Sequence, residues 1–324
     1  MNARDAKKIV SPDHLMIQTT SRCNSGCVMC PWPDTAKEQA QGDMSDDLYA
    51  RLVDEVKTFP KLERVLLYLM NEPLLDKKLP KRIEMMRRAA PQTEIYIITN
   101  GILLDEDLGE RLIDSGLSWL GISIHAIDDA TYKAVTGRAD FDKIRPRLER
   151  FMERALAARG ENFVQVNITK MRPHVTDEEF ERAAAHWRSV GVSRVDLDDG
   201  YISRAGNVPV FGHERVRTLR TSGCQTIWAY RMAHVLFNGD VVPCCMDWRR
   251  KVKFGNVLEA GGLLNVWRGA GREGFLDKLG SGDELPPDFL CVSCEDAIPA
   301  EGRSSRNPWK NVSRRTANAS ISSA

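Results

Sequence analysis

The stretch SRCNSGCVMCPWP, from Ser21 to Pro33, places three cysteines in the spacing C-x3-C-x2-C. Thiols this close in the chain must end in the same small volume, and the two prolines argue against a simple helical continuation. Three thiolates on one tight loop can bind three corners of an iron-sulfur cube, so that its fourth iron stays open for an exchangeable ligand. Zinc is the alternative, although structural zinc takes four protein ligands and usually a second C-x2-C pair.

Composition excludes several other classes of function. The chain has 324 residues, 42% hydrophobic and 28% charged, as in soluble globular proteins. Its 46 Lys and Arg nearly cancel its 45 Asp and Glu, so neither nucleic acid nor an acidic membrane is a favoured partner. No apolar run approaches the roughly 20 residues that span a bilayer, and the first residues lack the apolar middle of a signal peptide. We therefore expect a cytoplasmic protein whose eight cysteines are metal ligands or catalysts rather than disulfides.

Short apolar runs alternate with helical patterns between residues 14 and 199, which predicts repeated βα units and a parallel sheet or barrel. Ser45 and Asp105 are predicted to cap helices, and Thr176 forms a capping box with Glu179. In such folds the loops after the strands carry the chemistry, and the cysteine stretch directly follows the first strand. The predicted strands are HLMIQTT (14–20), RVLLYLM (64–70), EIYIITN (94–100), SWLGISI (118–124), FVQVNIT (163–169) and SRVDLDD (193–199).

The alternation ends at about Arg204. HVLFNGDVVPCC (234–245) predicts two short strands joined at Asn238-Gly239, and a helix is predicted from about Leu263 to Leu279. The polar, basic end of the chain is expected to be a disordered tail. The predicted fold is α/β, with a lead (1–12), a partial (β/α)6 TIM-like barrel (13–205), a small α+β domain (206–300) and the tail (301–324).

The cysteine motif after the first strand resembles the radical S-adenosylmethionine (radical SAM) superfamily, and the resemblance covers residues 14–199. In that family a [4Fe-4S] cluster binds SAM at its open iron and passes one electron that splits a carbon-sulfur bond, giving a 5'-deoxyadenosyl radical. The resemblance implies that Cys23, Cys27 and Cys30 are the cluster ligands. It also implies an external one-electron donor such as flavodoxin or ferredoxin. Met29 stands where the family often has an aromatic residue near the adenine.

Other strand ends match positions that bind SAM in this family. LMNEPLLD resembles the GGEP stretch, which implies that Glu72 holds the SAM ammonium, with Asn71 in place of a glycine. The other SAM-binding positions implied by the resemblance are Asn100, Ser123, Arg138 and Asn167.

Further polar residues are expected to face the substrate. His125, in SIHAID where the family often has Asp, is either a satisfied polar residue or a group that binds or deprotonates substrate. Asp198, Asp199 and Tyr201, after the sixth strand, are comparable candidates.

Five cysteines lie in the C-terminal region. Four thiolates, from Cys224, Cys244, Cys291 and Cys294, would close a second cluster completely and leave Cys245 over. The region resembles the SPASM auxiliary-cluster domains, and more closely their shortened twitch form, so we predict one auxiliary [4Fe-4S] cluster, with a zinc ribbon as the alternative. Adjacent residues of a strand point to opposite faces. Cys245 is therefore either a small core residue or a thiol that donates a hydrogen atom to a substrate radical.

The resemblance implies an enzyme that removes a hydrogen atom from a small polar substrate, a sugar, aminocyclitol or nucleoside, in natural-product (antibiotic) biosynthesis. About a dozen residues precede the first strand, so we expect no extra peptide-recognition domain of the kind that many peptide-modifying relatives carry, which favours a small substrate. Oxidation of an alcohol, with the auxiliary cluster as electron acceptor, is the first expectation. A radical epimerase that uses Cys245 as donor, and a ribosomal-peptide maturase, are the alternatives. The strand-end motifs argue against a non-catalytic metal-binding protein.

Overall fold

A nine-stranded sheet forms the centre of the computed structural model, which describes residues 2–171, 174–198, 203–208 and 217–301. The strand order is β10-β9-β8-β1-β2-β3-β4-β5-β6, and β1 to β6 are parallel, so the six predicted strands are confirmed. The strands are β1 (His14–Ile17), β2 (Arg64–Leu66), β3 (Glu94–Thr99), β4 (Trp119–Ser123), β5 (Val164–Thr169), β6 (Arg194–Asp198), β8 (Met232–Val235), β9 (Asp240–Val242) and β10 (Gly255–Asn256).

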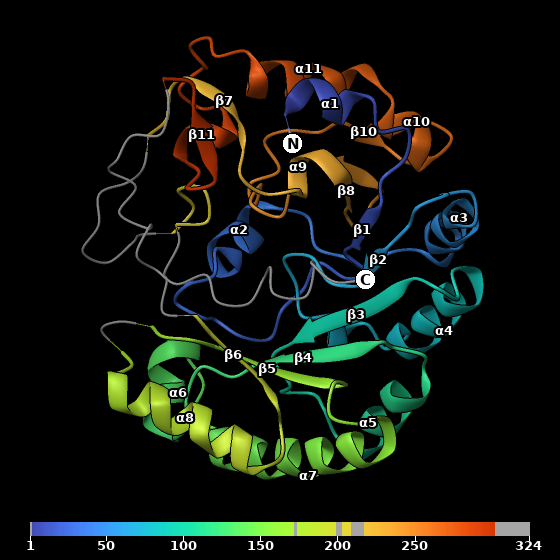
Figure 1. Cartoon of the computed structure of the whole chain (residues 1–324). Helices are drawn as coiled ribbons and strands as arrows, with labels where there is room; N and C mark the ends of the chain where they lie inside the picture. Colours follow the sequence, from blue (N-terminus) through green and yellow to red (C-terminus); the bar gives the residue numbers. More distant parts are fainter. Residues whose placement is uncertain (1, 172–173, 199–202, 209–216, 302–324) are drawn as a thin grey trace.

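Helices cover the outer side of this sheet. Figure 1 shows α4, α5, α7 and α8 along β3 to β6, where their apolar faces and the buried strand residues form one core. The helices up to β6 are α1 (Ala3–Lys7), α2 (Trp32–Glu38), α3 (Asp46–Val56), α4 (Leu79–Ala89), α5 (Glu106–Asp114), α6 (Asp129–Thr136), α7 (Phe141–Arg159) and α8 (Asp177–Ser189), with the 3-10 turn η1 (Pro73–Leu75). The caps at Ser45 and Asp105 and the capping box of Thr176 with Glu179 are present as predicted.

The cysteine stretch differs from the prediction in one respect. We expected its two prolines to prevent a helix, yet α2 begins directly after Pro31, and Pro33 lies in its first turn. The first backbone N–H groups of a helix have no partner inside it, so a proline there removes no hydrogen bond.

The C-terminal region contributes to the main sheet as well as to a smaller unit. The predicted hairpin is present: β8 and β9 are antiparallel, and Gly239, with φ +89°, lies in their turn. β8 also pairs in parallel with β1. The remaining elements are β7 (Thr221–Cys224) and β11 (Ala297–Pro299), which form a two-stranded sheet, with α9 (Trp228–Arg231), α10 (Leu263–Trp267), α11 (Ala270–Gly280) and the 3-10 turn η2 (Leu290–Ser293).

The helix predicted from Leu263 to Leu279 is wrong as a single element. Gly269 takes an extended conformation (φ −81°, ψ 161°) and separates α10 from α11. A Cβ atom on Gly269 would lie 3.1 Å from the carbonyl oxygen of Asn265, so the close turn between the two helices suits glycine.

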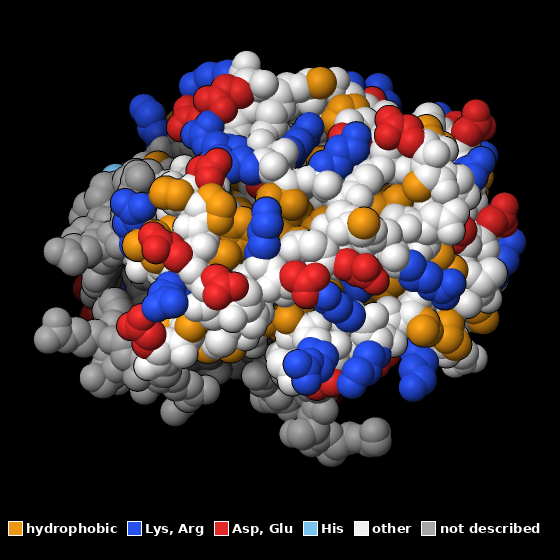
Figure 2. All heavy atoms as spheres, turned by 90° about the horizontal axis from the view of Figure 1, so that it is seen from above, with side chains coloured by type: hydrophobic (Ala, Val, Ile, Leu, Met, Phe, Trp, Pro, Cys, Tyr) orange, Lys and Arg blue, Asp and Glu red, His pale blue; other side chains and the backbone are white. Residues whose placement is uncertain are grey.

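The N-terminal helix packs on the C-terminal unit. Ala3 and Ala6 of α1 are buried in one cluster with Leu276 and Leu279 of α11, and Figure 1 shows the two helices side by side. Figure 2 shows acidic and basic side chains intermixed on this face of the molecule. None of the helices in the described ranges is long and apolar enough to cross a membrane. The tail expected from residue 301 lies, after Glu301, outside the described residues.

A third cluster of apolar side chains, here called the inner cluster, is separate from the core beneath the helices. Its members come from β1, β2, β8, β9 and the loops that follow them. They are Met16, Leu66, Leu69, Met232, Leu236 and Val242, with Tyr68, Met70, Tyr96, Trp228 and Cys245 packed against them.

Candidate active site with two groups of thiols

Three free thiols lie together on the loop after β1. Cys23, Cys27 and Cys30 are each partly exposed. Burial raises the pKa of Cys23 to about 12, and the negative charge of Glu72 and the other two thiolates act in the same direction. Thiolates that repel one another in one small volume are a donor set that the positive irons of a cube would stabilise, so these residues fit three corners of a [4Fe-4S] cluster.

The thiol-bearing loop has a defined shape. Trp32 closes it by donating its indole N–H to the carbonyl oxygen of Ser21 at 2.9 Å. The amide of Gly26 donates to the carbonyl oxygen of Thr136 at 3.1 Å, and the amide of Val28 donates to the carbonyl oxygen of Val135, also in α6, at 2.9 Å. The end of α6 therefore supports the loop from outside, and Met29 is buried beneath it.

Glu72 lies beside this loop, because its amide donates to the carbonyl oxygen of Arg22 at 2.8 Å. The buried carboxylate accepts hydrogen bonds from the Thr99 hydroxyl (2.6 Å) and from the amides of Asn100 (2.8 Å) and Leu74 (2.9 Å). Burial raises its pKa to about 7, although these hydrogen bonds oppose the rise. Hydrogen bonds therefore hold the Glu72 side chain in place after β2. With a pKa of about 7, its carboxyl group is partly protonated and partly ionised near neutral pH.

Asn24, which sequence reasoning missed, joins two of the predicted residues to the loop. The side-chain amide of Asn100 donates to the Asn24 side chain at 2.8 Å, and Arg138 donates to the Asn24 carbonyl oxygen at 3.3 Å. Arg138 also forms a two-pronged ion pair with Asp140, so its charge is already matched by a carboxylate. The position of Asn24 between two cluster cysteines was the only signal in the sequence.

Ser123 and Asn167 are neighbours across β4 and β5. The side-chain oxygen of Asn167 accepts from Gln165 at 2.7 Å, but its buried Nδ2 has no hydrogen-bond partner among the described residues. A Cβ on Gly121 would come within 3.0 Å of this nitrogen, so a glycine leaves room for the amide. An unpartnered buried donor is costly unless a ligand accepts from it, which fits a polar group of SAM here.

His125 is neutral and its protonation pattern is set by the backbone. Burial lowers its pKa to about 4, and the positive charge of Arg204 adds to this effect. Its Nδ1 accepts from the amide of Thr169 at 3.1 Å, so the ring proton is assigned to Nε2. His125 is therefore better suited to donate a hydrogen bond to substrate than to remove a proton. Asp198 ends β6, and Asp199 and Tyr201 lie outside the described residues.

Four of the five C-terminal thiols line the same hollow, and the fifth does not. Cys224, Cys244, Cys291 and Cys294 line one hollow of about 350 Å³, including its open mouth. Cys245 is not part of its lining. Apolar side chains such as Trp228, Met246, Phe275 and Leu290 complete the walls. A four-thiol donor set in an apolar hollow fits a fully ligated iron-sulfur cluster. Among the described residues, no group of three or more His, Cys, Asp or Glu side chains is arranged so that it could hold a single metal ion.

Cys245 instead packs against the inner cluster. Burial raises its pKa to about 12, and the nearby guanidinium of Arg204 opposes the rise. Tyr68 is close enough that Cys245 contributes to the raised pKa of its hydroxyl, after the larger effects of burial and Tyr96. Cys245 is therefore a neutral thiol at pH 7. It lies in the turn after β9, which ends at Val242, so the strand expected to run through the cysteine pair ends before it.

The chain belongs to the radical SAM superfamily, because the model of that superfamily matches residues 17–186. The model of the SPASM iron-sulfur cluster-binding domain matches residues 224–295. Superfamily and domain together imply three cofactors, a [4Fe-4S] cluster that binds SAM, SAM itself and an auxiliary [4Fe-4S] cluster, as predicted.

Particular relatives differ in what they act on. The chain is 27% identical to a GTP 3',8-cyclase of Chlorobaculum tepidum over 67% of this chain and 66% of that protein. The structure of BtrN in complex with AdoMet and 2-DOIA is similar with a TM-score of 0.57 and 21% identity, over 83% of this chain and 87% of BtrN. Streptococcus suis SuiB bound to precursor peptide SuiA has a TM-score of 0.64 and 15% identity, over 90% of this chain and 71% of SuiB. These two structural likenesses establish the fold alone.

Proposed function

We propose that this radical SAM enzyme removes a hydrogen atom from a small polar substrate and oxidises an alcohol. The four-thiol hollow carries the proposal. If Cys224, Cys244, Cys291 and Cys294 each bind one iron, the auxiliary cluster has no open position for substrate, and it is suited to take the second electron that alcohol oxidation releases. We assign the SAM-binding cluster to Cys23, Cys27 and Cys30.

The residues around the first cluster would bind and orient SAM. SAM, when bound and given one electron by a carrier such as flavodoxin or ferredoxin, supplies the radical that removes the hydrogen atom. Glu72 accepts from the methionyl amine, and the amide of Asn100 keeps the Glu72 carboxylate in place. Ser123 and the free Nδ2 of Asn167 offer polar contacts deeper in the sheet. His125 donates to the substrate from Nε2.

Epimerisation is the second candidate, and the position of Cys245 favours it. A neutral thiol on the inner cluster, outside the auxiliary ligand set, can return a hydrogen atom to a substrate radical. This leaves a thiyl radical on Cys245, which the external one-electron carrier and a proton from solvent would have to convert back to the thiol. The two outcomes differ in electron count. Oxidation transfers a further electron away from the substrate, whereas epimerisation restores the hydrogen and leaves the product at the same oxidation level.

Anaerobic reconstitution tests the enzyme class. Two four-iron clusters predict about eight irons per chain, and reduction in the presence of SAM should yield 5'-deoxyadenosine. Aminocyclitols, nucleosides and peptides are then supplied separately to identify the substrate class. The proposal is wrong if the reconstituted protein forms no 5'-deoxyadenosine with any reductant, or if only peptides are turned over.

Deuterated water separates the two outcomes. An exchangeable Cys245 thiol would place solvent deuterium on the product carbon, and Cys245→Ala would abolish the reaction. Oxidation would place none there, would consume one SAM per product and would survive Cys245→Ala. Unchanged epimerisation in the Cys245→Ala variant would contradict the donor role.

A further inference from the structure

The loop after β1 is tied together at its two ends. It runs from Ser21 to Gly42 and is here called the cysteine loop, because it carries the three N-terminal thiols as well as α2. The amide of Ser21 donates to the carbonyl oxygen of Gly42 at 2.9 Å, and the amide of Gly42 donates to the Ser21 hydroxyl at 2.8 Å. Helix α2 begins directly after Cys30 and Pro31. Because a helix is held by its own hydrogen bonds, a displacement of Cys30 is passed along α2.

The far end of α2 contacts the auxiliary domain. The side-chain amide of Gln39, the residue that follows α2, donates to the carbonyl oxygen of Trp248 at 2.7 Å. The neighbouring Glu38 carboxylate forms an ion pair with Arg249. Figure 1 shows α2 next to the C-terminal unit. Gln39 and Trp248 are 209 positions apart in the sequence, so only the folded chain brings them together.

Phe237, in the turn after β8, packs between the same two segments. A Cβ atom on Gly42 would lie 2.6 Å from the Phe237 ring, so the end of the cysteine loop lies directly on this ring. The Arg250 guanidinium is 5.8 Å from the centre of the ring on the side of the auxiliary domain. The hydrogen bond of Gln39 is therefore accompanied by close packing.

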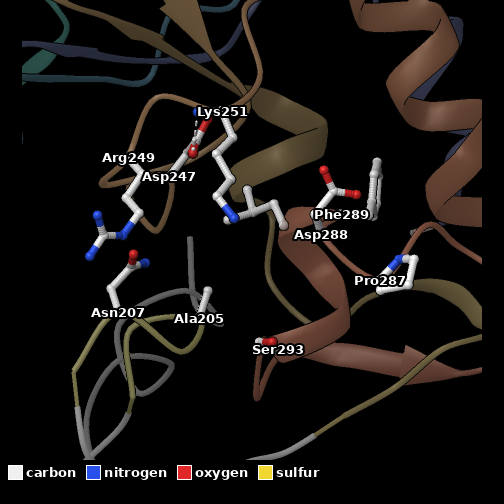
Figure 3. A pocket seen from close by; sticks show the side chains of 10 residues that line it. Ala205, Asn207, Asp247, Arg249, Lys251, Pro287, Asp288, Phe289 and Ser293 are labelled. Atoms are coloured by element: carbon white, nitrogen blue, oxygen red, sulfur yellow. Dashed lines mark hydrogen bonds between the residues drawn. The ribbon is translucent and has the colours of Figure 1, made fainter.

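Trp248 belongs to a compact turn that carries two of the C-terminal thiols. Residues 244–252 are here called the auxiliary turn. The amide of Asp247 donates to the carbonyl oxygen of Cys244 at 3.2 Å, and the buried Asp247 carboxylate accepts from the amides of Lys251 and Val252, both at 2.9 Å. Figure 3 shows Asp247 folded back onto this turn beside Lys251. The position of the Trp248 carbonyl is therefore passed on to Cys244.

Gln39 is a better link between the two segments than the ion pair beside it. The side chains of Glu38 and Arg249 are 57% and 39% exposed, and exposed ion pairs contribute little and are screened by salt. The Gln39 side chain is half-buried and neutral. Its acceptor is a backbone carbonyl, so the bond depends on where the auxiliary turn lies rather than on which side chain the turn carries.

We propose that Gln39 is a positioning residue that makes the cysteine loop and the auxiliary turn move together, so that SAM bound at the first also fixes Cys244 and Cys245 in the second. The inference rests on the proposed function, because it needs SAM to bind beside the cysteine loop. A ligand that orders one segment lowers the cost of ordering a segment coupled to it, and such coupling is reciprocal. An auxiliary thiol ligand and the candidate hydrogen donor are thereby held in place when SAM is ready to supply the radical.

Hydrogen exchange of the reconstituted holoenzyme, followed by mass spectrometry with and without SAM, tests this coupling. In the wild type SAM should slow exchange in residues 21–42 and also in residues 244–252. Gln39→Met keeps the length of the side chain but removes the donor. In this variant SAM should slow exchange only in the cysteine loop, and the auxiliary turn should exchange about twofold to tenfold faster than in the wild type with SAM.

Two further variants separate the hydrogen bond from other effects. Gln39→Lys, which keeps a donor of similar reach, should restore part of the protection of the auxiliary turn. Lys37→Met is the matched control and should behave as the wild type, because Lys37 is exposed on the same helix and pairs within it with Asp34 at 3.1 Å.

Four results would overturn the proposal. SAM might protect the auxiliary turn equally in the wild type and in Gln39→Met, or protect only the cysteine loop in the wild type. Loss of the coupling at high salt would assign it to the Glu38–Arg249 pair. A Gln39→Met protein that loses four of about eight irons would show that Gln39 serves cluster assembly instead. If SAM protects neither segment of the wild type and no 5'-deoxyadenosine forms, the proposed function itself fails.

Discussion

Replacement of Glu72 by Gln should remove a pH dependence from SAM binding. In the wild type the Glu72 carboxyl must be ionised to attract the methionyl amine, and its pKa is raised by burial from 4.5 to about 7. A Gln side chain is neutral at every pH. The affinity ratio of wild type to Glu72→Gln should therefore be near one in acid and should rise as the pH passes about 7.

The magnitude follows from the environment of the carboxylate. The rise from 4.5 to about 7, at 1.36 kcal/mol per pKa unit, means that the folded protein disfavours the ionised form by about 3 kcal/mol. At pH 6 about a tenth of the carboxyl is ionised, so the advantage over Gln should be about tenfold smaller than at pH 8. A hydrogen bond to a charged group is worth about 1.5 to 3 kcal/mol, which sets the plateau ratio at roughly tenfold to a hundredfold.

The assay is equilibrium binding of SAM to anaerobically reconstituted protein between pH 5.5 and pH 8.5. Use of the ratio cancels the titration of SAM itself. Glu84→Gln is the matched control, since Glu84 is exposed on α4 and its one ion pair among the described residues is with Arg88, at 3.8 Å. A ratio that stays constant across this range, or an equal effect of Glu84→Gln, would refute the assigned role of Glu72.

Three further predictions concern metal content and stability. Cys244→Ala should lose about four irons per chain on reconstitution, whereas Cys245→Ala should keep about eight; equal iron contents would contradict the division of the thiols. His234→Leu should leave the thermal midpoint unchanged or raise it by the equivalent of about 1 kcal/mol, because the buried ring meets the backbone of Met232 but forms no well-aligned hydrogen bond among the described residues, and a clearly destabilised variant would contradict this. Gly271→Ala should lower the free energy of unfolding by about 1 to 3 kcal/mol in urea denaturation, because its Cβ would overlap a backbone carbonyl. Gly274→Ala, which has open space around it, should be neutral or stabilising. Equal effects of the two substitutions would show that helix propensity alone decides.

Local chemistry explains what could be predicted. Ser45 caps its helix because a hydroxyl accepts from a nearby amide, and Asn238-Gly239 turns a hairpin because glycine tolerates a positive φ. The triplet of Cys23, Cys27 and Cys30 is confined to one loop by its spacing. Such features depend on neighbours a few positions away, so they can be read before the chain is folded.

Long-range packing explains what could not be predicted. Nothing in HVLF indicates that β8 pairs with β1, and nothing near Ala3 indicates that α1 packs on α11. Asn24 is the clearest case, because its hydrogen-bond partners Asn100 and Arg138 come from two other parts of the chain.

The sequence by itself determined the parallel sheet and the family and predicted the two sets of thiol ligands, since cysteine spacing and strand periodicity are properties of short segments. The tertiary structure alone decided which tautomer His125 takes and that Asn24 joins Asn100 and Arg138 to the cysteine loop. Burial, hydrogen-bond partners and electrostatic fields arise only when distant segments meet, and these quantities set the chemistry of the site.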